Sequence, residues 1–177
     1  MALKITFHKT GANSESALIG DLTLFNGTKV VHTVTAFSGG NGNHPLDDGN
    51  YRIHLDIRGD EGTAVCDNEG ALKPYYGIQN LPEEIANCNG TTGYPRLEWG
   101  SIRARLNPQS GTDHGYYLHG KERAGDWTHG CVCDRSGKIM NYLWNLDKPP
   151  RSVDVIVTGG KQFPIEELVK KNLIIVK

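Results

Sequence analysis

Apolar and polar side chains alternate along several short stretches of the chain, which is the pattern of a half-buried β-strand. In the first stretch, residues 2–8, the apolar positions are Leu3, Ile5 and Phe7. Similar alternation follows at residues 49–59 (Tyr51, Ile53, Leu55 and Ile57), 99–108 (Ile102, Ala104 and Leu106) and 152–160 (Val153, Val155 and Val157). Because Gly and Asn punctuate the chain between these stretches, we expect short strands joined by tight turns.

Two more segments extend this pattern. Residues 18–40 predict a β-hairpin with Asn26-Gly27 as its two-residue turn and β-branched side chains on both sides. Residues 114–120 predict a short aromatic strand. Several short strands at regular spacing are typical of a β-sandwich or an open barrel, so we expect a mainly β protein.

Helical patterns are fewer. Residues 81–88 carry a proline at the first helical position, which favours a helix start. Residues 136–148 place apolar side chains on one helical face, begin with a serine that can cap the helix, and end before two prolines. Residues 163–171 predict a small C-terminal helix with acids early and lysines late, and residues 172–177 suit a final strand.

Composition narrows the class of protein. The chain has 177 residues and a mass of 19.4 kDa, so we expect a single domain over residues 1–177. Its 19 basic and 20 acidic residues nearly balance, so no overall basic field favours nucleic acid. No apolar run reaches membrane-spanning length and the first residues lack a signal-peptide pattern, so we expect synthesis in the cytoplasm without membrane insertion. Four cysteines are too few for a disulfide scaffold of this size.

Residues 116–134 hold the side chains that nucleophilic catalysis needs. A thiol reacts as its thiolate and a nearby imidazole can take its proton, so a cysteine beside a histidine is the smallest activated unit. His119-Gly120 ends the aromatic strand, and Thr128-His129-Gly130-Cys131 follows. Gly130 permits a tight turn and lets an acyl group approach the sulfur. If the helix predicted from residue 136 begins close to Cys131, its free N–H groups favour a thiolate and an oxyanion.

This segment resembles the catalytic signature of the L,D-transpeptidases, which is a histidine, a spacer and then Ser/Thr-His-Gly-Cys. The stretch 38–53, with His44-Pro45 and Gly49-Asn50-Tyr51, is similar to that family's turn and strand, and the resemblance covers about residues 18–158. The compact chain also resembles the members that type VI secretion systems deliver as antibacterial effectors. Two features depart from the pattern. The spacer over residues 120–127 is shorter than usual, and Cys133 stands where the family commonly has Arg or Asn.

The resemblance implies a β-sandwich of L,D-transpeptidase type with a short helix after the catalytic cysteine. It also implies an enzyme of peptidoglycan stem tetrapeptides that needs no cofactor. Cys131 attacks the carbonyl of meso-diaminopimelate, and D-Ala leaves with a proton from His119. Water then completes L,D-carboxypeptidase cleavage, whereas an amine completes transpeptidation or D-amino acid exchange. Backbone N–H groups around Gly130 form the oxyanion hole, and the Gly120 carbonyl holds the base.

Further side chains have candidate roles with open alternatives. The candidates for substrate binding are Trp127, Tyr117, Thr128 and Arg135. Of these, Arg135 is the nearest polar substitute for the side chain missing at position 133. His129 is the alternative base. A zinc site made of His119, His129, Cys131 and Cys133 is another alternative, although Cys-x-Cys spacing is atypical of zinc.

The resemblance to secreted effectors implies export by a dedicated secretion system, action in the periplasm of target bacteria, and a cognate immunity protein that covers Cys131. Cys66 and Cys88 form a disulfide if the protein acts in such an oxidising compartment, and are two free thiols otherwise. Two other functions stay open. One is a non-catalytic cell-wall-binding or phage tail-associated module, and the other is a cysteine amidase of the cell wall, a class that usually places its cysteine before its histidine.

Overall fold

The period-2 pattern of residues 2–8 produces the central strand of a large sheet. In the computed structural model, which describes residues 2–160, β1 (Leu3–Ala12) buries Leu3, Ile5 and Phe7 on one face. The strand lies between β2 (Leu18–Asn26), which runs antiparallel to it, and β13 (Ser152–Thr158), which runs parallel. The predicted alternation in β13 is confirmed, because Val153, Val155 and Val157 are all buried.

Eleven strands form one mixed sheet in the order β10-β4-β13-β1-β2-β3-β12-β11-β9-β6-β5, and β7 and β8 form a separate hairpin. The remaining strands are β3 (Lys29–Ser38), β4 (Gly49–His54), β5 (Arg58–Gly59), β6 (Ile78–Asn80), β7 (Ile85–Cys88), β8 (Thr91–Gly93), β9 (Ile102–Arg105), β10 (Asn107–Pro108), β11 (Tyr117–His119) and β12 (Val132–Cys133). The helices are the 3-10 turn η1 (Glu61–Thr63), α1 (Arg96–Trp99) and α2 (Lys138–Trp144). The predicted mainly β class is therefore confirmed.

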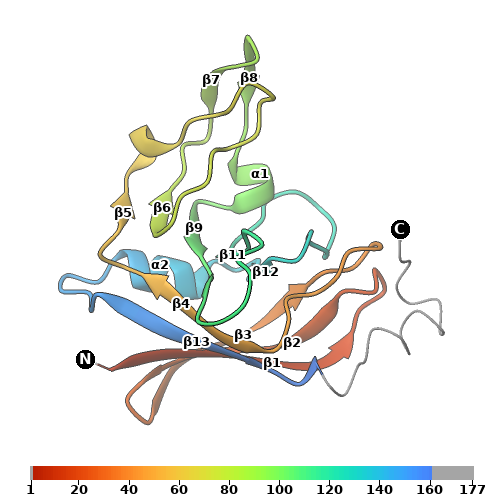
Figure 1. Ribbon diagram of the computed structural model, residues 1–177, viewed down its shortest axis with the longest axis vertical. Coiled ribbons are helices and arrows are strands. Elements are labelled where there is room, and N and C mark those ends of the chain that lie inside the picture. Colours follow the sequence, from red (N-terminus) through yellow and green to blue (C-terminus); the bar gives the residue numbers. More distant parts are fainter. Residues whose placement is uncertain (1, 161–177) are drawn as a thin grey trace.

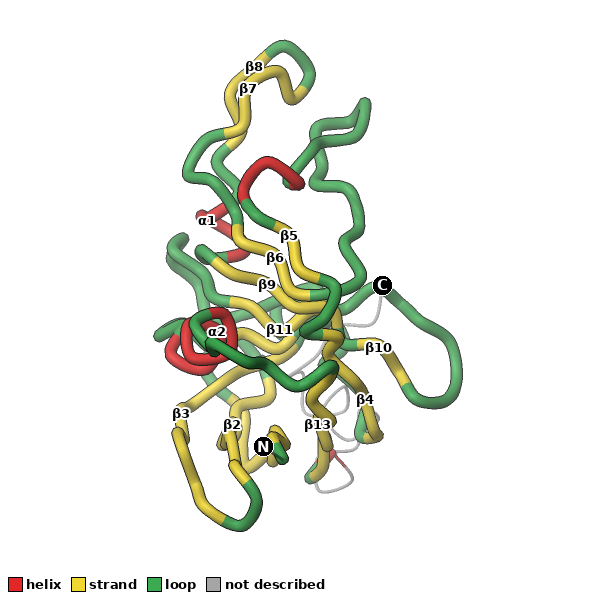
Figure 2. Tube along the Cα trace, turned by 90° about the vertical axis from the view of Figure 1, so that its left-hand side faces the viewer, coloured by secondary structure: helices red, strands yellow, loops and turns green. Residues whose placement is uncertain are grey.

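The sheet folds over on itself. β4 and β9 contact each other although six strands separate them in the sheet order. Figures 1 and 2 show β9, β11 and β6 stacked above the layer of β13, β1, β2 and β3, with α2 beside them. One cluster of buried side chains joins both layers, from Phe7 and Leu22 to Leu118 and Leu143. The strands stay paired where the sheet bends, so both layers belong to one sheet. The sequence had suggested two separate sheets or a barrel.

The predicted hairpin over residues 18–40 is present as β2 and β3, with its turn shifted by one residue. Asn26 pairs with Lys29, so the two loop residues are Gly27 and Thr28 instead of Asn26-Gly27. Gly27 has a φ of +61°, and a glycine with positive φ in the first loop position is the type II′ arrangement. The strand predicted over residues 49–59 ends early, at His54, and Ile57 is exposed.

The helix predicted over residues 81–88 is absent, and β7 takes its place. Cys88 pairs with Thr91 across Asn89-Gly90, and both turn residues have positive φ, 52° and 75°. Asn-Gly in a type I′ turn is a strong hairpin signal, and it outweighs the proline that favoured a helix start. Figure 1 shows this hairpin at the end of a projection built from two segments, one between β5 and β6 and the other between β6 and α1.

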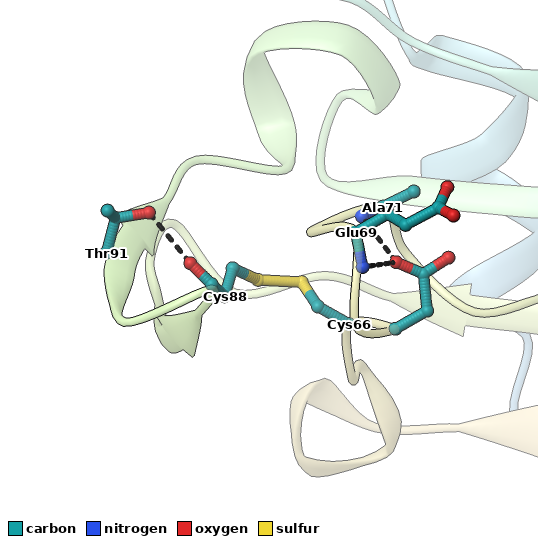
Figure 3. Close-up of a disulfide and its surroundings, with 6 residues drawn as sticks. Cys66, Glu69, Ala71, Cys88 and Thr91 are labelled. Atoms are coloured by element: carbon teal, nitrogen blue, oxygen red, sulfur yellow. Dashed lines mark hydrogen bonds between the residues drawn. A yellow bond between two sulfur atoms is a disulfide. The ribbon is translucent and has the colours of Figure 1, made fainter.

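A disulfide between Cys66 and Cys88 ties β7 to the facing loop of the projection (Figure 3). Around it, the Asp67 carboxylate accepts hydrogen bonds from the N–H groups of Glu69 and Ala71. The Thr91 hydroxyl donates to the Cys88 carbonyl at 2.7 Å. Of the two alternatives open from the sequence, the structure has the paired cysteines.

The helix expected after Cys131 is present as α2, which buries Ile139, Met140 and Leu143 as the pattern of residues 136–148 predicts. It has seven residues, and no helix in the described part of the chain has the length and apolar character to cross a membrane. The helix predicted over residues 163–171 and the final strand lie outside the described residues.

Candidate active site

Cys131 lies directly before β12, in the part of the sheet where β12 pairs with β3 on one side and β11 on the other. β11 and β12 are parallel, with Leu118 opposite Val132. This register brings the N–H of Tyr117 to the thiol, to which it donates a hydrogen bond at 3.3 Å. The side chain of Cys131 is buried, with 8% of its surface exposed.

His119 ends β11 and lines the same cavity as Cys131, which has a volume of about 380 Å³ and which we call the Cys131 cavity. Nδ1 of His119 is hydrogen-bonded to the backbone carbonyl of Gly120. A carbonyl only accepts, so Nδ1 carries the proton and Nε2 keeps its lone pair. The ring of Trp99 packs edge-on against the imidazole, with centroids 5.0 Å apart. The predicted base is therefore oriented by backbone and by an aromatic ring.

Burial keeps both groups neutral at rest. It lowers the pKa of His119 to about 4, although the Gly120 carbonyl opposes the change. Burial also raises the pKa of the Cys131 thiol to about 11, against the opposing effects of the Tyr117 N–H and the charges of Arg103 and Arg105. A site in this state holds a thiol and a neutral imidazole, so proton transfer to His119 must accompany attack by the sulfur.

The helix α2 does not begin directly at Cys131, so the condition under which its free N–H groups would favour a thiolate is not met. β12 and a turn separate Cys131 from α2, whose first residue is Lys138. The carboxylate of Asp134 accepts the N–H groups of Ser136 and Ile139, at 3.0 and 3.5 Å. The start of α2 is thus satisfied by a side chain on the turn, which leaves desolvation as the main influence on Cys131.

Two hydroxyl groups hold the turn that presents the cysteine. Oγ1 of Thr128 accepts the N–H groups of Gly39 and Gly130, at 3.0 and 3.1 Å, and donates to the carbonyl of Cys131 at 2.6 Å. Oγ of Ser38 donates to the Gly130 carbonyl at 3.1 Å and accepts the Leu46 N–H at 2.8 Å. Thr128 lines the cavity, yet its hydroxyl is fully engaged in the turn.

Gly130 is required by its backbone conformation, as predicted for a tight turn, and also by a neighbouring ring that the sequence did not indicate. Its φ is +131°, and a Cβ at this position would lie 2.4 Å from Cε1 of Tyr116. The space left by the missing side chain is therefore filled by the Tyr116 ring and does not serve as a path for an acyl group. Because its N–H is bonded to Thr128, Gly130 supplies no free oxyanion donor, whereas the Cys131 N–H lies against its own thiol.

Trp127, a predicted substrate contact, and His129, the alternative base, both line the Cys131 cavity. Their rings meet edge to face with centroids 5.2 Å apart. Lys121 lies over the Trp127 ring and donates to the Trp127 carbonyl at 3.0 Å. His129 is exposed, whereas His119 is buried and oriented, so the two candidate bases differ in how firmly they are held.

Arg135 and Tyr117 do not line the Cys131 cavity. The guanidinium of Arg135 pairs with Asp126 at 2.6 Å and donates to the carbonyls of Arg123 and Gly125, both at 2.9 Å. Arg135 therefore holds the loop that forms one wall of the cavity. Tyr117 contributes its backbone N–H to Cys131, and its ring packs against Trp99 and lines a second cavity.

The residues at the site that were not assigned there from the sequence include Ser38, Trp99, Lys121, Arg103 and Arg105. Ser38 belongs to the stretch that resembles the transpeptidase turn, so its motif was visible although its role was not. The two arginines alternate with Ile102 and Ala104, which predicts solvent-facing positions, and nothing local indicates their burial. Within residues 2–160, no three His, Cys, Asp or Glu side chains converge as a metal site, so the zinc cluster has no structural counterpart there.

No known protein family matches the sequence, and no curated protein does. Among solved structures, Bd1075 of Bdellovibrio bacteriovorus is similar, with a TM-score of 0.44 and 13% identity over 95% of this chain and 55% of that chain. This chain thus spans just over half the length of that structure. Similarity at this level does not establish a shared fold or activity.

Proposed function

We propose that this protein is a cysteine acyltransferase of peptidoglycan stem tetrapeptides, with L,D-carboxypeptidase or L,D-transpeptidase activity, built on a fold of the L,D-transpeptidase type. The observation that carries the proposal is the pairing of Cys131 with His119 in one cavity, with Nε2 as the free basic atom of the imidazole. The signature His119-Gly120 and Thr128-His129-Gly130-Cys131 supplies the substrate class by resemblance.

The proposed reaction begins from the neutral pair. As the Cys131 sulfur bonds to the carbonyl carbon of diaminopimelate, its proton passes to Nε2 of His119. The donor to the developing oxyanion in this proposal is the Cys131 N–H, which lies against the thiol at rest, because the Gly130 N–H is already engaged by Thr128. The same proton then goes to the amine of D-Ala as the peptide bond breaks, leaving a thioester. Water or an amine attacks the thioester and releases tripeptide or an exchanged tetrapeptide.

The test uses the two free cysteines as a matched pair. Wild type, Cys131→Ala and Cys133→Ala are each incubated with disaccharide-tetrapeptide, with and without D-Met, and the products are identified by mass spectrometry. We expect tripeptide or the D-Met product from wild type and Cys133→Ala, because Cys133 is buried away from the cavity beside Phe37 and Ala17. We expect unchanged tetrapeptide from Cys131→Ala.

Unchanged tetrapeptide from folded, reduced wild type would contradict the proposal. Binding of intact peptidoglycan in that case would favour the non-catalytic wall module, and release of the whole stem peptide from the sugar would favour the amidase. Circular dichroism of all three proteins establishes that each is folded.

We propose as a corollary that the protein is a secreted antibacterial effector acting in the periplasm, where a cognate immunity protein covers the Cys131 cavity. This corollary rests on the resemblance to compact secreted members. Expression of wild type with a periplasmic leader should lyse cells, and Cys131→Ala should not. A neighbouring gene whose product carries a signal peptide should restore growth, and failure of every neighbour to protect would contradict the partner.

A further inference from the structure

Strand β9 buries two arginine side chains close to the candidate active site. Arg103 is 1% exposed and Arg105 is 6% exposed. Arginine is rarely buried to this extent without an acidic partner. Within residues 2–160, the only ion pair made by either is the one between Arg105 and Asp113, at 3.0 Å. The two positive charges are therefore matched by a single carboxylate.

Arg103 is held entirely by neutral groups. Its guanidinium lies over the rings of both Trp99 and Tyr117, 4.7 and 4.6 Å from their centroids. It donates to Oε1 of Gln79 at 2.9 Å and to the Lys73 carbonyl at 2.8 Å. These contacts fix its position but leave its charge uncompensated, which costs free energy in a buried setting.

Only some of the hydrogen-bond donors of Arg105 have a partner. Nη1 donates to the hydroxyl of Tyr117 and Nη2 to Oδ2 of Asp113, each at 3.0 Å. Its Nε is buried and has no hydrogen-bond partner in the described part of the chain. Oδ1 of Asp113 accepts the N–H of Gly115 at 2.8 Å, so this carboxylate meets the guanidinium through one oxygen. A carboxylate free to bind through both oxygens forms a stronger pair with the fork of an arginine.

Both arginines line a second cavity of about 380 Å³, which we call the arginine cavity and whose walls also include Trp99, Tyr117 and His114. The Trp99 side chain is common to the arginine cavity and the Cys131 cavity. The charge of Arg103 is close enough to act on both Cys131 and His119. The indole of Trp99 therefore borders both cavities, so the two sites adjoin.

We infer that the arginine cavity is a carboxylate subsite, in which Arg105, supported by the charge of Arg103, binds a carboxylate of the same ligand whose acyl group reaches Cys131. In the free protein the carboxylate of Asp113 is paired with the guanidinium of Arg105, so it competes with the carboxylate of the ligand. This inference deepens the proposed function and rests on it, because the stem tetrapeptide is the ligand considered. The acyl part of that peptide, which remains after D-Ala and its own carboxylate leave, carries free carboxylates on D-Glu and on diaminopimelate, and either supplies the same chemistry.

The test measures binding to Cys131→Ser protein, which cannot form the thioester, by titration calorimetry. The probes are disaccharide-tetrapeptide and two forms of it, amidated at the D-Glu carboxylate or at the diaminopimelate carboxylate. Loss of a charge-assisted hydrogen-bonded pair should weaken binding about 10- to 100-fold for one of the two amidated forms. The other amidated form should bind as tightly as the unmodified peptide, which identifies its carboxylate as the one that the arginine cavity does not bind.

Three further substitutions in the Cys131→Ser background separate recognition from folding. Arg105→Lys keeps the charge but loses the fork, and should weaken the unmodified peptide about tenfold or more. Asp113→Asn keeps both arginines and the bond to Gly115 but removes the competing charge, so it should tighten binding several-fold. Arg151→Gln, at an arginine that is 93% exposed and pairs with Asp56, is the matched control and should change nothing.

Equal binding of all three peptides, or unchanged affinity in both Arg105→Lys and Asp113→Asn, would overturn the subsite. If wild type fails to turn over tetrapeptide while binding still depends on one carboxylate, the proposed reaction fails and the subsite stands. If turnover occurs with equal KM for all three peptides, the reaction stands and the subsite fails. Absence of any binding at millimolar peptide overturns the subsite for this ligand.

Discussion

Nδ1 of His119 is bonded to the backbone carbonyl of Gly120, the next residue in the chain. This contact orients the imidazole without an acidic side chain, and no carboxylate in the described residues bonds to it. Because Nδ1 carries the proton of the neutral ring, Nε2 is unprotonated. The proposed base is therefore oriented through the backbone, and burial decides whether its imidazole is charged.

Opposite shifts of two pKa values predict how stability depends on pH. The pKa of His119 is lowered from 6.5 to about 4, so the unfolded chain takes up its proton first and stability falls as pH drops from 6.5 toward 4. The pKa of Cys131 is raised from 9.0 to about 11, so the unfolded chain loses its proton first and stability falls as pH rises from 9 toward 11. Each loss is on the order of 3 kcal/mol.

Urea unfolding across this pH range checks both limbs. His119→Gln should flatten the acid limb only, and Cys131→Ala should reduce the alkaline limb only, part of which remains because burial also raises the pKa of Cys133, to about 12. Profiles for both variants that run parallel to wild type at every pH would show that neither group is buried in this way.

The raised pKa of Cys131 also predicts slow alkylation. In oxidised Cys133→Ala protein the remaining free thiol is Cys131, because Cys66 and Cys88 are paired. At pH 7.5 its reaction with iodoacetamide should be roughly a hundredfold slower than that of free cysteine, and should rise about tenfold per pH unit up to pH 10. A fast rate that is constant from pH 6 to 8 would instead indicate a thiolate–imidazolium pair.

Gly130→Ala should destabilise the protein by more than about 3 kcal/mol, because it adds backbone strain and a clash with Tyr116. Gly111→Ala is the matched control, since Gly111 has a φ of +80° and open space around it, so it reports the backbone term alone, about 1 kcal/mol. Chemical denaturation measures both. Adding Tyr116→Ala should recover part of the Gly130→Ala loss, and equal losses at the two glycines would argue against the clash.

Thr128→Val keeps the shape of the side chain but leaves the N–H groups of Gly39 and Gly130 and the Cys131 carbonyl without their partner. Since each unsatisfied buried group costs about 1 kcal/mol or more, we expect a loss of at least about 2 kcal/mol in the free energy of unfolding. Thr128→Ser retains the hydroxyl and should stay within about 1 kcal/mol of wild type. If Val and Ser behave alike, the hydroxyl does not hold the turn.

Arg135→Met tests whether this arginine holds the wall loop or contacts substrate. Because its guanidinium bonds to Asp126 and to the carbonyls of Arg123 and Gly125, its loss should speed tryptic cleavage after Arg123 several-fold. Arg151→Met removes an exposed ion pair elsewhere and should leave cleavage unchanged. A raised KM with unaltered cleavage would instead support the direct substrate contact predicted from the sequence.

Much of the framework was predictable because the signals for it lie within short segments. Alternation at Leu3, Ile5 and Phe7 specifies which face of β1 is buried, and a one-residue shift would expose all three. The helical face of α2 follows from spacing in the same way. The helix predicted over residues 81–88 was wrong for a local reason too, because the Asn89-Gly90 turn signal was overlooked.

What the tertiary structure decided is the environment of each group. Arg103 and Arg105 have the spacing of solvent-facing positions, but the folded-over sheet and the rings of Trp99 and Tyr117 cover them. The motif around Cys131 suggested an activated thiolate, whereas burial of the site holds a neutral thiol. Periodicity and turn chemistry depend on residues a few positions apart, so the sequence by itself determines them. Desolvation depends on which distant segments pack together, so it arises only when the chain is folded.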